Sequence, residues 1–150
     1  MPSSLKQLSP SDADAAALVH RTAFDERLPW LSGLHTPEED RSFYREQVFA
    51  TCEVWGGFER DALLGVIAFR ADWIDHLYVL PCAQGRGLGS GLLEIAKSHA
   101  ERLSLWTFQR NVGARRFYES RGFIIVKETD GRENEEQEPD AHYSWARQTR

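Results

Sequence analysis

The sequence lacks several features that would each point to a particular class of protein. Its 150 residues include only two cysteines, Cys52 and Cys82, and neither lies beside other cysteines or histidines. We therefore expect neither a disulfide framework nor a bound metal. No apolar run is long enough to span a bilayer, and the first residues carry no apolar core like that of a signal peptide. These absences predict a cytoplasmic protein that does not act at a membrane.

Positive charge is also scarce. The chain has 18 lysines and arginines against 23 aspartates and glutamates, a formal net charge of -5. Because nucleic acids are bound mainly through cationic contacts with their phosphates, this balance disfavours nucleic acid as the main partner. It is compatible with a cationic substrate such as an amine. Length, an apolar content of 41% and the lack of repeats or linkers predict one domain over residues 1–150.

Local patterns predict a chain of alternating helices and strands. Near the N-terminus, Thr36-Pro37-Glu38-Glu39 combines an N-cap, a proline at the first helical position and a glutamate three residues after the cap. This capping box predicts a helix from about Pro37 to Phe49. Residues 53–58 and 63–70 are typical of a hairpin, and the strand from Trp73 to Leu80 continues it.

The most informative stretch begins as a strand and ends as a helix. Residues 74–80 alternate in the manner of a strand, and Pro81 ends the strand because proline cannot donate to a sheet ladder. From Leu88 onward the apolar residues take helical spacing. Gly85, Gly87 and Gly89 therefore form a loop that opens the helix.

A glycine loop before a helix can hold a phosphate. The first amides of a helix have no internal partner, the dipole is positive at that end, and glycine lets a phosphate approach the backbone closely. A P-loop would need Gly-Lys-Ser/Thr after its glycines, and a dinucleotide fingerprint would need Gly-x-Gly-x-x-Gly. The stretch matches neither, and a plain strand-to-helix turn is the alternative.

Two motifs resemble those of one family. Gln84-Gly85-Arg86-Gly87-Leu88-Gly89 resembles the Gln/Arg-x-x-Gly-x-Gly/Ala signature of the GNAT superfamily of acyl-CoA-dependent N-acetyltransferases. The segment from Asn111 to Phe123 is similar to the family's Asn-x-x-Ala-x-x-Phe-Tyr-x-x-x-Gly-Phe. The resemblance covers residues 53–127 and, more loosely, the whole chain. It implies a single N-acetyltransferase domain with an α/β fold, whose mixed, mostly antiparallel sheet has about seven strands and helices on both faces.

The resemblance also implies acetyl-CoA as the co-substrate. In the family, this loop holds the coenzyme A pyrophosphate, which assigns that role to Gln84, Gly85, Arg86, Gly87, Leu88, Gly89 and Ser90. Backbone amides are the expected ligands, and the Arg86 side chain can add charge at the phosphate edge. The backbone of Leu77, Tyr78 and Val79 is expected to pair with the pantetheine amides as an added strand would. Asn111 matches a coenzyme-contacting asparagine of the family and is also a good N-cap.

Acyl transfer to an amine requires a proton acceptor. An alkyl ammonium has a pKa of about 10, so a base or a water chain must take its proton. Asp75 and His76 precede the predicted pantetheine segment and are candidates, with Glu46 and Glu53 as less specific ones. A neighbouring aspartate can raise the pKa of a histidine. Both residues can equally be ordinary polar residues at the start of a strand.

The reaction also needs donors for the oxyanion and for the leaving thiolate. A backbone amide near Val79 is a candidate for the oxyanion. Tyr118 matches the family's general-acid tyrosine, which also lies at the coenzyme, although an aromatic residue beside Phe117 can simply be part of the core. Cys82 suggests a covalent acyl-cysteine, but the sequence names no group that would activate its thiol.

The acceptor is left open by the sequence. A small-molecule primary amine is the leading interpretation, a peptide N-terminus or lysine is the nearest alternative, and a non-catalytic acyl-CoA sensor is the third. The acidic run from Glu133 to Asp140 is more typical of a solvated loop than of the rim of a polycation site. The oligomeric state is also open, and a homodimer is compatible with the sequence.

Overall fold

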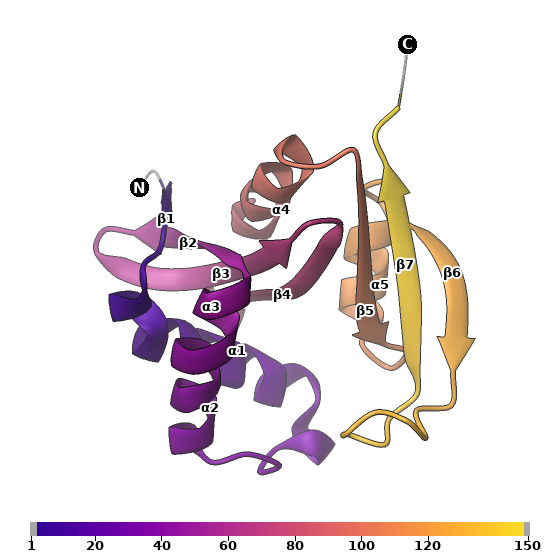
Figure 1. The fold of residues 1–150 in the computed structure, drawn as a ribbon, viewed down its shortest axis with the longest axis horizontal. Helices are drawn as coiled ribbons and strands as arrows, with labels where there is room; N and C mark the ends of the chain where they lie inside the picture. Colours follow the sequence, from indigo (N-terminus) through magenta and orange to yellow (C-terminus); the bar gives the residue numbers. More distant parts are fainter. Residues whose placement is uncertain (1–2, 149–150) are drawn as a thin grey trace.

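A seven-stranded sheet with the order β1-β2-β3-β4-β5-β7-β6 forms the centre of the structure, a computed structural model that describes residues 3–148 (Figure 1). Only β4 and β5 are parallel, and every other neighbouring pair is antiparallel. The mixed, mostly antiparallel sheet predicted from the sequence is therefore confirmed. The strands are β1 (Ser3–Gln7), β2 (Glu53–Glu59), β3 (Ala62–Arg70), β4 (Trp73–Val79), β5 (Arg102–Phe108), β6 (Ile124–Thr129) and β7 (Asp140–Ala146).

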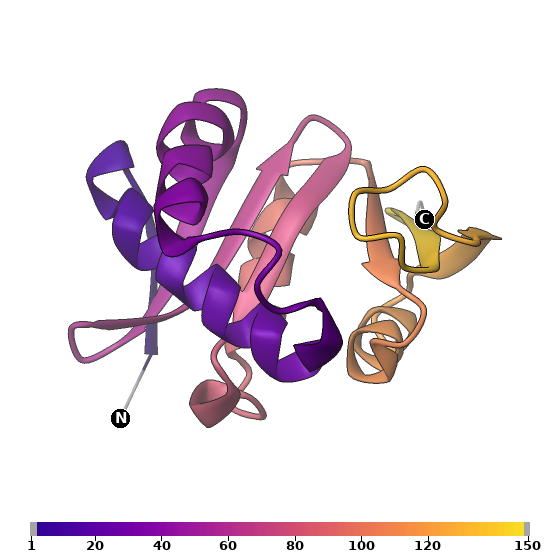
Figure 2. The same cartoon turned by 90° about the horizontal axis from the view of Figure 1, so that it is seen from below.

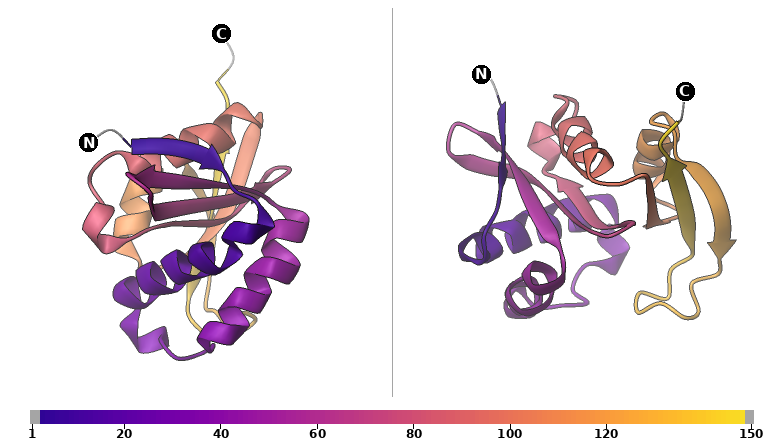
Figure 3. Two further views of the ribbon diagram at one scale, coloured as in Figure 1. Left: turned by 90° about the vertical axis from the view of Figure 1, so that its left-hand side faces the viewer. Right: turned by 45° about the horizontal axis from the view of Figure 1, so that its top comes forward.

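Helices cover both faces of the sheet, as expected (Figure 3). On one face lie α1 (Ala13–Arg27), α2 (Pro37–Phe43) and α3 (Phe49–Thr51), and on the other lie α4 (Leu88–Ser98) and α5 (Val112–Glu119). Alternation along β3 divides the core accordingly. Val66 and Ala68 pack in the cluster that contains α1, whereas Ile67 and Phe69 pack in the cluster that contains α4. No helix within residues 3–148 is both long enough and apolar enough to cross a membrane.

The helix predicted over residues 37–49 begins as expected but does not continue as one α-helix. Thr36 Oγ1 accepts from the Glu39 amide at 3.1 Å, and Glu39 Oε1 accepts from the Thr36 amide at 2.7 Å, so the capping box forms. A π-helical turn over Tyr44–Val48 then separates α2 from α3. Tyr44 and Val48, at the two ends of this turn, are both buried in the cluster that contains α1.

Strands β4 and β5 meet only where they begin. Their single register pair is Trp73 with Ser104, and the Ser104 amide donates to the Asp72 carbonyl at 2.7 Å. Beyond that pair the two strands, both fully described, diverge (Figures 1 and 2). A β-bulge against β3 adds to the irregularity, because Ile74 pairs with Phe69 and His76 pairs with Ala68, which leaves Asp75 as the extra residue.

The core makes a direct prediction about stability. Leu103→Ala should lower the free energy of unfolding by about 2–5 kcal/mol, because the side chain on β5 is 0% exposed and its removal leaves a cavity. Leu18→Ala on α1 is the matched control, since that leucine is 68% exposed and the change should be within about 0.5 kcal/mol. Urea denaturation of both variants gives the comparison. Equal losses would contradict the described packing.

Candidate active site

A cavity of about 800 Å³ lies where β4 and β5 diverge. It is lined by both strands, by the loop before α4, by α5, by the end of α1 and by part of the segment before β7. The cavity brings most of the predicted site residues together. Those that line it are Asp75, His76, Leu77, Tyr78, Val79, Gln84, Gly85, Gly87, Gly89, Ser90, Asn111 and Tyr118.

The loop before α4 presents free amide donors to this cavity. Gly85 and Gly87 each have φ of +81°, and a Cβ at either position would meet no atom within 4 Å, so backbone conformation rather than space requires glycine there. Gly87 is the N-cap of α4, and the first amide to reach a backbone carbonyl is that of Gly91, which donates to Gly87 at 3.0 Å. Among the described residues, the amides of Gly85 to Ser90 have no acceptor. This geometry is suited to an anion.

Two predicted residues of the loop face elsewhere. The Arg86 side chain forms an ion pair with Glu59 at the end of β2, with 2.5 Å between Nη1 and Oε1, and it does not line the cavity. Leu88 is buried under β2 and β3, where Gly57 leaves the space that its side chain fills. The Arg86 side chain thus faces Glu59 rather than the cavity, while its backbone amide remains in the row of donors.

Arg121 supplies a cation that the sequence reasoning missed. It follows α5 and lines the cavity, and its Nε donates to Ser90 Oγ at 2.9 Å. Its guanidinium carbon lies 3.9 Å from the centre of the Phe117 ring, which holds the group flat over an aromatic face. The residue occupies an unspecified position of the Asn111–Phe123 motif, so only the fold reveals that it lies beside the helix N-terminus.

Arg27 is a second unpredicted cation in the cavity wall. It lies at the end of α1, and its Nη2 donates to Gln84 Oε1, while Gln84 Nε2 donates to the Val79 carbonyl at 3.0 Å. A Cβ at position 113 would come within 2.7 Å of Arg27 Nη1. Gly113, which from sequence alone only weakens the first turn of α5, therefore leaves room for this guanidinium.

Asn111 and Tyr118 occupy the two ends of α5. Asn111 Oδ1 accepts from the Ala114 amide at 3.2 Å, so its expected capping role is confirmed. Tyr118 is buried, and its hydroxyl has no hydrogen-bond partner among the described residues. Burial, with a smaller contribution from Tyr78, raises the pKa of Tyr118 well above its usual value. Its hydroxyl therefore stays protonated at neutral pH and can donate into the cavity.

Asp75 raises the pKa of His76 as expected, but burial has the larger effect and the net shift is downward. Burial lowers the pKa of His76 to about 4, and the nearby Asp75 charge offsets only part of that shift. The Asp75 carboxylate is engaged by other groups, since it accepts from Arg70 Nε at 2.7 Å and from Cys52 Sγ at 3.4 Å. The His76 ring lies 5.0 Å from the ring of His20, and its buried Nδ1 has no partner in the described chain. His76 is thus neutral at pH 7. Neither alternative base, Glu46 or Glu53, lines the cavity.

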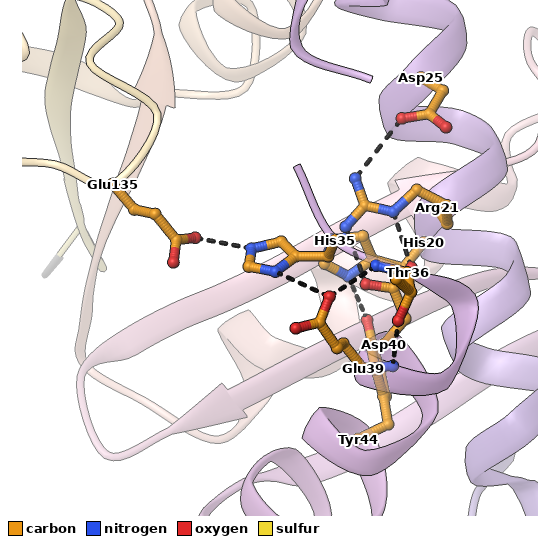
Figure 4. Close-up of polar contacts among 9 residues, drawn as sticks. All are labelled: His20, Arg21, Asp25, His35, Thr36, Glu39, Asp40, Tyr44 and Glu135. Carbon is orange, nitrogen blue, oxygen red and sulfur yellow. Dashed lines mark hydrogen bonds and ion pairs between the residues drawn. The ribbon is translucent and has the colours of Figure 1, made fainter. Parts of the chain in front are cut away.

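A polar network behind the cavity joins α1 to α2 (Figure 4). Arg21 binds both carboxylate oxygens of Asp40, at 2.8 and 2.9 Å. His20 Nδ1 lies 2.6 Å from the Tyr44 hydroxyl, and burial lowers the pKa of this histidine. These contacts fix the wall on which the rings of His76 and Tyr78 pack.

The acidic segment before β7 is not the solvated loop that its composition suggests. Glu138 is 4% exposed, and its carboxylate accepts from Trp30 Nε1 at 2.9 Å and pairs with Arg110 Nε at 3.2 Å. Glu135 lies 2.7 Å from His35 Nε2 (Figure 4). These partners come from far along the chain and dock the segment against the α1–α2 connection. Its members that line the cavity are Asn134, Glu136 and Asp140.

Comparison with known proteins agrees with this geometry. A family model described as an acetyltransferase (GNAT) domain matches residues 45–125, more than half of the chain. The chain therefore belongs to the GNAT acetyltransferase family. Its sequence is 30% identical over 83 residues to the peptidyl-lysine N-acetyltransferase YiaC of Escherichia coli strain K12. That alignment spans 55% of this chain and 57% of YiaC.

Solved structures share the fold. The apo form of YjaB from Escherichia coli superposes with a TM-score of 0.81 and 22% identity, over 99% of this chain and 100% of YjaB. PaiA N-acetyltransferase from Thermoplasma acidophilum, solved in complex with coenzyme A, gives a TM-score of 0.72 and 20% identity, over 97% of this chain and 99% of PaiA. At these identities the likeness concerns the fold alone.

The glycine loop yields a prediction for coenzyme binding. Gly87→Ala should weaken binding of coenzyme A by about tenfold or more, because a Cβ at φ of +81° strains the loop and disperses its amides. Gly33→Ala is the control, since Gly33 has φ of +87°, equally open surroundings and no place in the cavity lining. Isothermal titration measures both. Equal affinities in the two variants would refute the cradle.

Burial of neutral His76 predicts a pH-dependent stability. The unfolded histidine binds a proton below its ordinary pKa of 6.5, whereas the folded one binds it only near 4. The free energy of unfolding should therefore fall as the pH drops through that window, by on the order of 3 kcal/mol from this residue. His76→Gln should flatten the slope in urea denaturation between pH 7 and pH 4. An unchanged slope would contradict the assigned burial.

Proposed function

We propose that this chain transfers an acetyl group from acetyl-CoA directly to the primary amine of a small molecule. The observation that carries the proposal is one cavity that holds a row of free amides, an unpaired strand edge and a protonated tyrosine. Family membership gives the same reaction class. A non-catalytic acyl-CoA sensor is disfavoured, because such a sensor would not need the Tyr118 hydroxyl in the cavity wall.

The residues present fit the coenzyme. Its diphosphate would be held by the amides from Gly85 to Ser90, beside the cations of Arg121 and Arg27. The backbone of Leu77 to Val79 would pair with the pantetheine amides, because β5 has diverged from β4 at that point. Bound in this way, acetyl-CoA would supply an activated thioester to the cavity.

The chain's own groups would then support the transfer. The acceptor nitrogen forms the new C–N bond, and the C–S bond breaks. A backbone amide near Val79 would stabilise the charge that develops on the carbonyl oxygen. The Tyr118 hydroxyl would donate to the departing sulfur. Because its pKa is raised, this hydroxyl is always protonated when the sulfur begins to leave.

A lysine side chain of a protein or peptide is the second candidate acceptor. YiaC is named as a peptidyl-lysine N-acetyltransferase and is similar to this chain over 83 residues. A lysine side chain presents the same primary alkylamine as a small molecule, so the cavity chemistry serves both. Peptide N-termini form a third class of acceptor for the same assay.

A panel of acceptors tests the function. Small alkylamines, lysine peptides and peptides with free N-termini are each incubated with acetyl-CoA, and free thiol release is measured. The proposal expects thiol release with at least one class and an acetylated product by mass spectrometry. Tight coenzyme binding without turnover on any acceptor would instead support a sensor.

Removal of one hydroxyl tests the assigned acid. Tyr118→Phe should lower kcat by about 100-fold or more while coenzyme affinity stays within about twofold, because the lost proton donor acts on the leaving thiolate. Tyr143→Phe is the control, since its hydroxyl binds Glu119 and Arg115 outside the cavity. Steady-state kinetics and titration of coenzyme A separate the two. Unchanged kcat in Tyr118→Phe would remove the role.

A further inference from the structure

One carboxylate in the cavity has no partner. The acidic residues that line the cavity are Asp75, Glu136 and Asp140. Asp75 is bound by Arg70, and Asp140 accepts from Asn134 Nδ2 at 3.2 Å and from the Thr129 hydroxyl. Glu136 has neither a hydrogen bond nor an ion pair within residues 3–148, although the segment that carries it is otherwise densely bonded.

The segment holds Glu136 in place from both sides. Glu135 is fixed by His35, and Glu138 is fixed by Trp30 and Arg110. Asn134 also donates to the Glu138 carbonyl at 2.8 Å, which closes a tight turn around Glu136. The backbone that carries this carboxylate is therefore held by contacts on both sides.

Glu136 and Tyr78 line the same cavity. Burial is the largest cause that raises the pKa of Tyr78 to about 12, and the Glu136 charge is the smallest. The cations Arg27 and Arg121 lie instead beside the loop before α4. Figure 2 shows the segment before β7 well separated from that loop. The cavity is thus positive where phosphates would bind and negative where Glu136 lies.

Neither of the other candidate bases in the cavity is suited to accept the proton of the acceptor amine. Asp75 is neutralised by Arg70, and His76, with a pKa of about 4, is a weak base at neutral pH. The buried Nδ1 of His76 has no partner within residues 3–148. Because buried polar atoms are normally hydrogen-bonded, a polar group of a bound ligand can pair with it.

We propose that Glu136 binds the acceptor ammonium and takes up its proton, an inference that rests on the proposed acetyl transfer. An N–H bond of the ammonium breaks and its proton moves to the Glu136 carboxylate. The freed electron pair on nitrogen forms the C–N bond with the acetyl carbon, and the C–S electron pair leaves with the sulfur, which takes the proton of the Tyr118 hydroxyl. The acetylated nitrogen then loses its second proton, which returns to the Tyr118 oxygen. No further reactant is needed.

The same carboxylate selects a class of acceptor. An alkylamine brings only positive charge to Glu136, and its methylene groups can lie against the aromatic side chains of Trp106 and Phe108 in the wall. A free α-amino acid would bring its own carboxylate close to Glu136, and like charges repel. Alkylamines and lysine side chains are therefore favoured over the α-amines of free amino acids.

Glu136→Gln tests this assignment because it keeps the shape and removes the charge. The value of kcat/KM for an alkylamine should fall by about 100-fold, while the KM for acetyl-CoA stays within about twofold. The acidic limb of the pH profile of kcat/KM should move to higher pH, since the variant can use only acceptor that is already deprotonated in solution. Discrimination against free amino acids should shrink, and Glu136→Asp should retain more activity than Glu136→Gln.

Glu133→Gln is the matched control, since it neutralises an exposed glutamate of the same segment that does not line the cavity. It should leave kcat/KM within about twofold. Wild-type kinetics in Glu136→Gln, or an equal loss in both variants, would overturn the inference while the transferase function stands. If Glu136→Gln lowers both the affinity for coenzyme A and the melting temperature, Glu136 has a structural role and the inference is overturned. If the wild-type chain acetylates no amine, the proposed function fails first and the inference falls with it.

Discussion

The divergence of β4 from β5 after a single register pair is the constraint on which the rest of the structure depends. An interior strand edge carries amides and carbonyls that must find partners, and a protein normally pairs or covers such an edge. Here the edge of β4 is left open inside the domain, while β7 and β6 extend the sheet beyond β5. Helices α4 and α5 share one core cluster with both strands. A ligand with amide groups can therefore complete the sheet.

The electrostatics of the cavity follow from its walls. Free helix amides and two arginines make one end positive, and an unpaired carboxylate makes another part negative. Burial of the side chains keeps His76 neutral and Tyr118 protonated. The same burial lowers stability at acidic pH, because it opposes the charged forms of His76 and His20. Such conflicts between stability and local environment are expected at a functional site.

Local features of this fold could be predicted from the sequence because neighbouring residues determine them. The strand, glycine loop and helix around Gly87, the capping box at Thr36 and the N-cap at Asn111 each depend on a few adjacent residues. The resemblance to the GNAT family also predicted the mixed, mostly antiparallel sheet. The π-helical turn after α2 was missed because tertiary packing of Tyr44 and Val48 decides it.

Other features depend on contacts between distant residues, and the sequence could not indicate them. Arg27 meets Gln84 across 57 positions, and His35 meets Glu135 across 100, so no local pattern reports either contact. The sign of the His76 pKa shift was mispredicted because its neighbour in sequence, Asp75, has less effect than the rings that bury it. The β-bulge also turns the Asp75 carboxylate toward Arg70.

The most direct test of the account is the backbone amide spectrum of the isotope-labelled protein during titration with coenzyme A. The account predicts that the largest shifts occur at the amides of Gly85 to Ser90 and along Leu77 to Val79, with saturation at one coenzyme per chain. The glycine at position 33 should not respond. Binding that leaves the Gly85–Ser90 amides unshifted, or no binding at all, would contradict the claim that free main-chain donors beside an open strand edge form the coenzyme site.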